Sequence, residues 1–110
     1  MRLRWSRRAE DDVAHIVEHI AEENPRAAIN VGDAIERHAK QLKRFPEIGR
    51  PGRIPGTREL IIASLPFIAV YRIRADMVEI VRVLHGAQQW PTIARRPRSL
   101  RAPIAKRLGK

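Results

Sequence analysis

Four side chains in the C-terminal half of the chain carry chemistry that could act on a phosphate group: Arg58, Arg72, Arg82 and His85. A histidine side chain titrates near neutrality, so His85 could give or take a proton as a general acid or base. The guanidinium groups of the arginines could bind a phosphate or a carboxylate through paired hydrogen bonds. If the three arginines converge, they form a cationic patch on the predicted sheet.

Each of these side chains also has a purely structural interpretation. His85 could cap the end of the last predicted strand by bonding to the backbone or to a neighbouring side chain, and no matching second residue for catalysis is evident. The arginines could instead pair across strands with the acids near them, at Glu59, Asp76 and Glu79. Both interpretations stay open at the level of the sequence.

The segments that must position these residues begin with a strand and a helix. Leu3 and Trp5 alternate with arginines, which predicts a short strand at residues 2–5 with one face on a core. Ser6 can cap the helix that follows. Apolar residues then recur at steps of three and four, at Ala9, Val13, Ile16, Val17 and Ile20. This stripe predicts a helix of about 17 residues with one buried face.

A second amphipathic helix is predicted directly after the first. Asn24 is a good N-cap, and Pro25 fits the first helical position, where no backbone donor is needed. The apolar stripe of this helix consists of Ala28, Val31, Ile35, Leu42 and Phe45, and Pro46 ends it. Because the joint is short, the two helices should pack antiparallel and cover a sheet. The residues expected to be buried there are Ile16, Ile20, Val31, Ile35 and Leu42.

Three strands are predicted in the second half of the domain, after a loop at 46–56 that holds three prolines and three glycines. The strands cover residues 58–62, 67–74 and 77–85, and Ala75 and Asp76 join the last two in a tight hairpin. The order β-α-α-β-β-β predicts an α+β fold, in which an N-terminal helical hairpin covers one face of an antiparallel sheet.

The last predicted strand is apolar on both faces, which indicates a central position in the sheet. Strict alternation would place its side chains in two sets. One set is Val78, Ile80, Arg82 and Leu84, and the other is Glu79, Val81, Val83 and His85.

Positive charge is concentrated at the C-terminal end of the chain. The 22 Lys and Arg against 12 Asp and Glu give a net charge of +10. Seven of the basic residues and none of the acids fall in residues 92–110. We therefore expect a mildly basic folded domain at 1–91 and a basic, disordered tail at 92–110. The high isoelectric point alone does not indicate a nuclease.

The composition also limits location and cofactors. No apolar run reaches the roughly 18 residues of a membrane span, and the N-terminus lacks a secretory signal, so we expect a cytoplasmic protein with no membrane partner. Without cysteine there is no disulfide and no thiolate zinc site. His15, His19 and His38 lie at helical spacings but lack a carboxylate cluster, so neither a metal nor another cofactor is expected.

Several short motifs follow one another in a characteristic order. A strand ending in Trp5-Ser6 and the sequence Asn-Pro-Arg-Ala-Ala at 24–28 precede Phe-Pro-Glu-Ile-Gly-Arg-Pro-Gly at 45–52 and Thr-Arg-Glu-Leu at 57–60. Val-Tyr-Arg at 70–72 and Ile-Val-Arg-Val-Leu-His-Gly-Ala at 80–87 complete the series. In this order and spacing the motifs resemble the ParE/RelE toxins of type II toxin–antitoxin systems. The resemblance covers residues 2–91 and does not extend to the tail.

The resemblance implies a toxin that a cognate acidic antitoxin neutralises in a heteromeric complex. It also implies one of two targets, because RelE-like members cleave mRNA in the ribosomal A site and ParE-like members poison DNA gyrase. RelE-like members commonly carry an arginine two residues before the Val-Tyr pair, where this chain has Ile68. After the last strand it has Gln88 and Gln89, which can neither protonate a leaving group nor neutralise a phosphate.

These differences favour the ParE-like branch, a gyrase poison that inhibits growth by docking and without catalysis. The residues expected to bind the target or the antitoxin are Arg58, Arg72, Arg82, His85, Gln88 and Trp90. The alternative is a RelE-like, ribosome-dependent and metal-independent mRNA endonuclease that uses Arg58, Arg72, Arg82 and His85 as catalytic residues. A third hypothesis is an inactive member that is kept for antitoxin binding.

Overall fold

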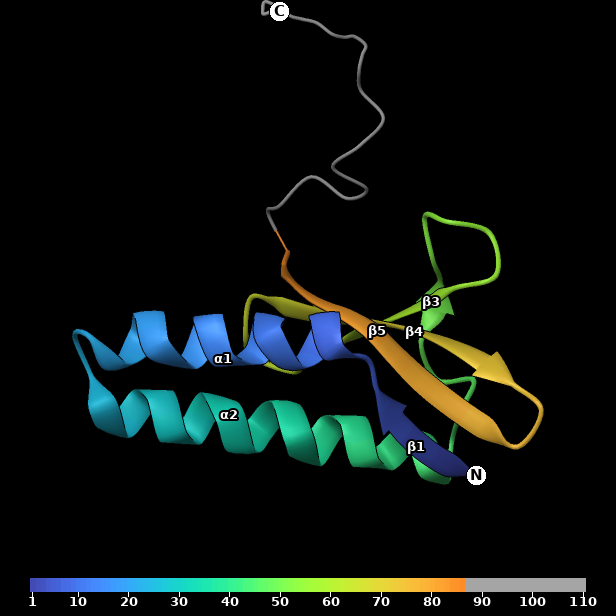
Figure 1. Cartoon of the computed structure of the whole chain (residues 1–110), viewed down its shortest axis with the longest axis horizontal. Helices are drawn as coiled ribbons and strands as arrows, with labels where there is room; N and C mark the ends of the chain where they lie inside the picture. Colours follow the sequence, from blue (N-terminus) through green and yellow to red (C-terminus); the bar gives the residue numbers. More distant parts are fainter. Residues whose placement is uncertain (87–110) are drawn as a thin grey trace, which may run out of the picture.

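A helical hairpin and a five-stranded sheet form the two layers of the protein (Figure 1). The structure is a computed structural model that describes residues 1–86. In chain order the elements are β1 (Arg2–Trp5), α1 (Arg7–Ala21), α2 (Pro25–Lys40), the 3-10 turn η1 (Gln41–Lys43), β2 (Arg50–Pro51), β3 (Arg58–Ile61), β4 (Phe67–Arg74) and β5 (Met77–His85). The α+β class and the predicted order of elements are confirmed, with the two-residue β2 added before β3. The tail expected at 92–110 lies outside the described residues.

The strands are arranged in the order β1-β5-β4-β3-β2, so β5 lies inside the sheet between β1 and β4, although the middle position belongs to β4. The sheet is mixed and not wholly antiparallel, because β1 runs parallel to β5. The other neighbours pair antiparallel. The reason is the connection: both helices lie between β1 and the other strands in the sequence, and a long crossover lets two strands pair in the same direction.

Both helices begin at the residues that the sequence indicates. The Oγ of Ser6 accepts a hydrogen bond from the backbone N–H of Ala9 at 3.0 Å, and the Oδ1 of Asn24 accepts one from Ala27 at 3.0 Å. Each bond satisfies a donor that the first turn of a helix leaves without a partner. The first helix has 15 residues, slightly fewer than expected. The second continues into η1, which ends three residues before Pro46.

The main core lies between the sheet and the half of the helical hairpin that covers it. Its fully buried large side chains include Tyr71, Ile80, Ile62, Ile35 and Leu42, so the predicted burial of Ile35 and Leu42 is confirmed. The three other residues expected in the core, Ile16, Ile20 and Val31, are only partly buried. The far end of the hairpin extends past the sheet, so the apolar stripes of the helices lack a sheet beneath them there (Figure 1).

A register shift in the β4–β5 pair changes which side chains share a face. Val70 pairs with Arg82 but Tyr71 pairs with Ile80, so β5 has one extra residue at this point. A β-bulge of this kind reverses the alternation beyond it. As a result Val83 joins the main core, whereas Leu84 lies on the opposite face. The strict alternation expected for this strand is therefore wrong beyond Val81, while the predicted hairpin at Ala75 and Asp76 is confirmed.

Candidate functional site

The three arginines singled out from the sequence lie in three separate bonding environments. Arg58 donates to the backbone oxygens of Gly49 at 2.7 Å and Glu47 at 3.2 Å. The guanidinium of Arg72 pairs with the carboxylate of Glu79 at 2.7 Å, and that of Arg82 pairs with Asp12 at 2.8 Å. The pairing of Arg72 with Glu79 agrees with the structural interpretation, in which the arginines pair across strands with nearby acids. The structure does not gather the three guanidinium groups into one patch.

Asp12 on α1 supports the free edge of β5, a role that the sequence did not reveal. Strand β1 ends at Trp5, so the second half of β5 has no strand beside it on that edge. The Oδ2 of Asp12 accepts hydrogen bonds from the backbone N–H of Val83 at 2.9 Å and from the Nε of Arg82 at 2.8 Å. The hydroxyl of Ser6 donates to the backbone oxygen of Val81 at 3.1 Å. Side chains of the α1 segment thus replace the missing strand.

The loop before β3 is held to the sheet by one buried tyrosine. The hydroxyl of Tyr71 donates to the backbone oxygen of Pro46 at 2.7 Å and accepts from the backbone N–H of Gly49 at 2.9 Å. Burial raises the pKa of Tyr71 above its ordinary value, although the bond from Gly49 and the charge of Arg58 act in the opposite direction. The hydroxyl therefore stays protonated at neutral pH and keeps donating to Pro46.

A buried carboxylate, Glu59, fixes the other end of this loop. Its side chain is 1% exposed and lies against the guanidinium of Arg50 at 3.0 Å and that of Arg53 at 3.3 Å. It also accepts from the backbone N–H of Arg53 at 3.1 Å. Burial alone would raise the pKa of Glu59, but the bond from the Arg53 backbone and the two guanidinium groups outweigh burial and hold the pKa below its ordinary value.

The sequence offered Glu59 as a cross-strand partner for Arg58, Arg72 or Arg82, whereas in the structure it pairs with Arg50 and Arg53. His85 lies at the exposed end of β5, with its ring edge-on to Phe67 and the ring centroids 5.7 Å apart. The two residues are partners in the β4–β5 register. Gln88 and Trp90, the other candidates for partner binding, lie outside the described residues.

The face of the sheet opposite the main core is apolar in its middle. Ile68, Val70 and Leu84 form a buried cluster there, with Val81 packed against it. Ile68 occupies the position where RelE-like toxins commonly carry an arginine, and it is 7% exposed. At this position the sheet therefore has a buried hydrocarbon side chain and no cation.

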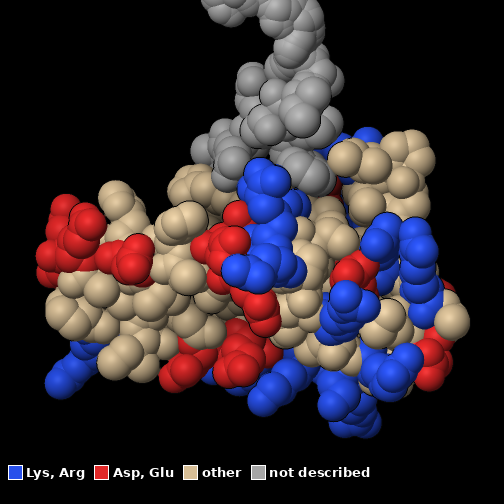
Figure 2. All heavy atoms as spheres, viewed as in Figure 1, with Lys and Arg blue, Asp and Glu red and all other residues tan. Residues whose placement is uncertain are grey.

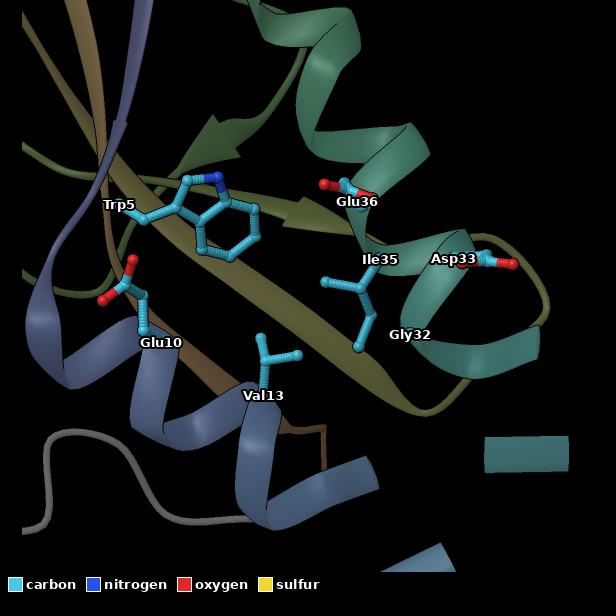
Figure 3. A pocket seen from close by; sticks show the side chains of 7 residues that line it. All are labelled: Trp5, Glu10, Val13, Gly32, Asp33, Ile35 and Glu36. Atoms are coloured by element: carbon cyan, nitrogen blue, oxygen red, sulfur yellow. The ribbon is translucent and has the colours of Figure 1, made fainter. Parts of the chain in front are cut away.

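A hollow of about 480 Å³ opens between α1 and α2 beside the end of β1 (Figure 3). It is lined by Trp5, Glu10, Val13, Gly32, Asp33, Ile35 and Glu36. Trp5 packs against the core as the sequence predicts, yet it is only partly buried because one side of its ring faces this hollow. The hollow could not be predicted from the sequence, because its lining residues come together only when α2 packs beside α1.

Charges are distributed unevenly over the molecule. Figure 2 shows Asp and Glu at the tip of the helical hairpin and in patches on the face in view, whereas Lys and Arg gather toward the sheet and also lie along the lower edge of the hairpin. The hollow lies on the acidic side, with three carboxylates among the residues that line it. The helical side and the sheet side therefore suit partners of different charge. No helix within residues 1–86 is long and apolar enough to cross a membrane.

A sequence model described as the ParE toxin of the type II toxin–antitoxin system parDE matches residues 3–90, so the chain belongs to this toxin family. It is the toxin component of a type II system, and its partner is an antitoxin.

Individual relatives support the same assignment. The chain is 44% identical over 92 residues to the putative toxin Y4kP of Sinorhizobium fredii, a match that covers 84% of this chain and 95% of the relative. It is 33% identical over 87 residues to toxin RelE1 of Caulobacter vibrioides, covering 74% of this chain and 89% of the relative. A solved structure titled "Chromosomal ParDE TA system from P. aeruginosa" superposes with a TM-score of 0.67 at 28% identity, covering 77% of this chain and 95% of that chain.

Proposed function

We propose that this toxin acts in the cytoplasm by docking onto DNA gyrase and that it has no catalytic chemistry of its own. The observation that carries the proposal is the apolar face of β4 and β5, where Ile68 is buried with Val70 and Leu84. Cleavage of RNA without a metal needs a base, an acid and cations around one phosphate. A buried apolar cluster in this place supplies none of these groups, which supports docking over phosphoryl chemistry.

The bonding of the arginines supports the same proposal. A cation that stabilises a transition state must be directed at the substrate. Arg58 is directed at loop carbonyls, and Arg82, whose side chain is 14% exposed, at Asp12. Arg72 and His85 are easier for a partner to reach, so we assign target or antitoxin binding to them in the first place.

We further propose that the antitoxin is acidic and meets the cationic side of the toxin. Long-range attraction between opposite charges raises the association rate and is screened within about 10 Å at 0.1 M salt. Association should therefore slow as salt is added. An antitoxin whose association rate does not depend on salt contradicts this part of the proposal.

The test of the target uses purified toxin in two parallel assays. Gyrase-dependent supercoiling should fall when the toxin is added and recover with a stoichiometric amount of antitoxin. Translating ribosomes with the same toxin should show no mRNA cleavage. Two relatives are named RelE1 and RelE2, so the alternative target is the ribosome. If the toxin cleaves mRNA in the A site and leaves supercoiling unchanged, the gyrase proposal is wrong.

A matched variant separates docking from catalysis. Replacement of a true general acid or base lowers a rate by about 100- to 10,000-fold. His85→Ala at equal expression should leave growth inhibition within a few-fold of the parent, because docking uses the histidine only as one contact. If the parent cuts mRNA on translating ribosomes and His85→Ala abolishes the cutting while it still folds and binds antitoxin, the docking proposal is wrong.

A further inference from the structure

The floor of the hollow between α1 and α2 is apolar: Trp5 and Val13 are only partly buried there, and Ile35, which also lines it, is 1% exposed. The side chains of Trp5, Val13 and Ile35 point toward one another across it (Figure 3). They come from β1, α1 and α2, so the packing of three elements shapes the floor. A Cβ on Gly32 would lie 3.4 Å from the Cγ2 of Val17, an ordinary contact, so α1 and α2 pack closely beside the hollow. An open apolar floor on a folded domain is typical of a surface that receives another segment.

The rim of the hollow carries carboxylates that the domain leaves without ionic partners. Glu10, Asp33 and Glu36 are exposed, and within residues 1–86 none of them forms an ion pair. Among the described residues that line the hollow there is no lysine or arginine. Three unpaired acids around an apolar floor define a docking surface for a segment that is both basic and apolar.

The chain itself contains such a segment. Residues 92–110 carry seven Lys and Arg and no acid, and Ile93, Leu100, Ile104 and Leu108 are interspersed among the charges. The described part of the chain ends at Gly86, close to α1. Three residues earlier, the backbone N–H of Val83 donates to Asp12 on α1, which is next to Val13 in the sequence. Nine residues from Gly86 to Arg95 can span up to about 30 Å. The basic segment can therefore reach the hollow.

We propose that the hollow between α1 and α2 is the docking site of this chain's own basic segment, residues 92–110. Its arginines meet the carboxylates of Glu10, Asp33 and Glu36, and its apolar side chains cover the exposed parts of Trp5 and Val13. The attachment is intramolecular, so a short linker gives an effective concentration of about millimolar and a weak contact suffices for occupancy. Docking of this kind needs no regular secondary structure in the segment, because charge pairing and apolar contact do not depend on backbone hydrogen bonds.

The test uses a spin label on the full-length chain. The chain has no cysteine, so Ser99→Cys provides one attachment point within the basic segment. In the free toxin at low salt we expect the label to broaden the NMR signals of the Trp5 indole and of the Val13 and Ile35 methyl groups. The methyl group of Ile61, exposed on β3 at the other side of the sheet, should stay sharp. Sharp signals at all three hollow residues, or equal broadening of Ile61, would overturn the proposal.

Two charge variants of the labelled chain test the role of the rim. The variant Glu10→Gln, Asp33→Asn, Glu36→Gln should lose most of the broadening, and 0.5 M salt should have the same effect on the parent. The matched control neutralises three carboxylates near the tip of the hairpin, at Glu18, Glu22 and Glu23, and should keep the broadening. Unshifted methyl signals of Ile62, which is fully buried in the core and does not line the hollow, show that either variant is folded. Broadening that survives neutralisation of the rim, or that the control loses equally, would overturn the assignment of the site.

A mixed sample decides between this chain's own segment and that of a second copy. Isotope-labelled chains without the spin label are mixed with spin-labelled chains without isotopes. Intramolecular docking leaves the signals of Trp5, Val13 and Ile35 sharp in this mixture. Broadening in the mixture as strong as in the singly labelled chain would mean that a second copy fills the hollow, and the proposal would be wrong.

Discussion

Replacing Tyr71 with phenylalanine removes a single oxygen atom that supports two backbone groups. The hydroxyl bonds to the oxygen of Pro46 and to the N–H of Gly49, and the tyrosine ring is fully buried. Phenylalanine keeps the ring, so no cavity opens and the apolar packing is unchanged. The change in the free energy of unfolding therefore reports on the two hydrogen bonds and the loop that they hold.

The expected cost follows from leaving both backbone groups without a partner. Each buried polar group that loses its hydrogen bond costs about 1–3 kcal/mol. The buried amide of Gly49 should carry most of this, while Pro46 is half-buried and water can reach part of its oxygen. We expect Tyr71→Phe to lower the free energy of unfolding by about 2–4 kcal/mol.

Urea denaturation of the full-length chain measures this cost. The midpoint should fall while the slope m stays the same, because the surface exposed on unfolding does not change. Amide exchange at Gly49 should become faster. The control is Thr57→Ala, which removes a hydroxyl from a half-buried position in the same loop, where it donates to Ile54 at 2.6 Å. Its cost should stay under about 1 kcal/mol. Equal costs for Tyr71→Phe and Thr57→Ala would refute the reasoning.

Three further outcomes follow from the described contacts. Ile35→Ala should cost about 2–5 kcal/mol in denaturant unfolding, against under about 0.5 kcal/mol for Ile29→Ala, whose side chain is 64% exposed. The folded pKa of Glu59 lies below its ordinary 4.5, so its contribution to stability is full above pH 4.5 and is lost as the pH falls through the folded value. Stability of Glu59→Gln should therefore depend less on pH across that range, and an unchanged acid profile would show that Glu59 is not responsible. Asp12→Ala leaves the backbone N–H of Val83 in β5 without its acceptor and should lower the free energy of unfolding by about 1–3 kcal/mol. The neighbouring Asp11 is exposed, so Asp11→Ala should be nearly neutral. Similar unfolding midpoints for the two variants would contradict the role of Asp12 at the edge of β5.

The helices and the strand segments could be read from the sequence because their signals are local. Ser6 and the pair Asn24-Pro25 cap helices through bonds that span three residues, and apolar periodicity marks the buried faces. The strands at 67–74 and 77–85 have the predicted bounds. The strand predicted at 58–62 ends one residue earlier, at Ile61. The order of local motifs was also enough to indicate the toxin family.

Contacts between distant residues were decided only by the tertiary structure. Arg82 pairs with Asp12, 70 positions away, and the hydroxyl of Tyr71 reaches Pro46, 25 positions away. Periodicity specifies which face of an element is apolar but not which element lies against it, so the parallel pairing of β1 with β5 was not predictable from it. A single extra residue in β5 reverses the faces of Val83 and Leu84, because side chains in a strand alternate with a period of two. The hollow between the helices has the same origin, since its floor and its carboxylates come from elements that meet only when the chain is folded.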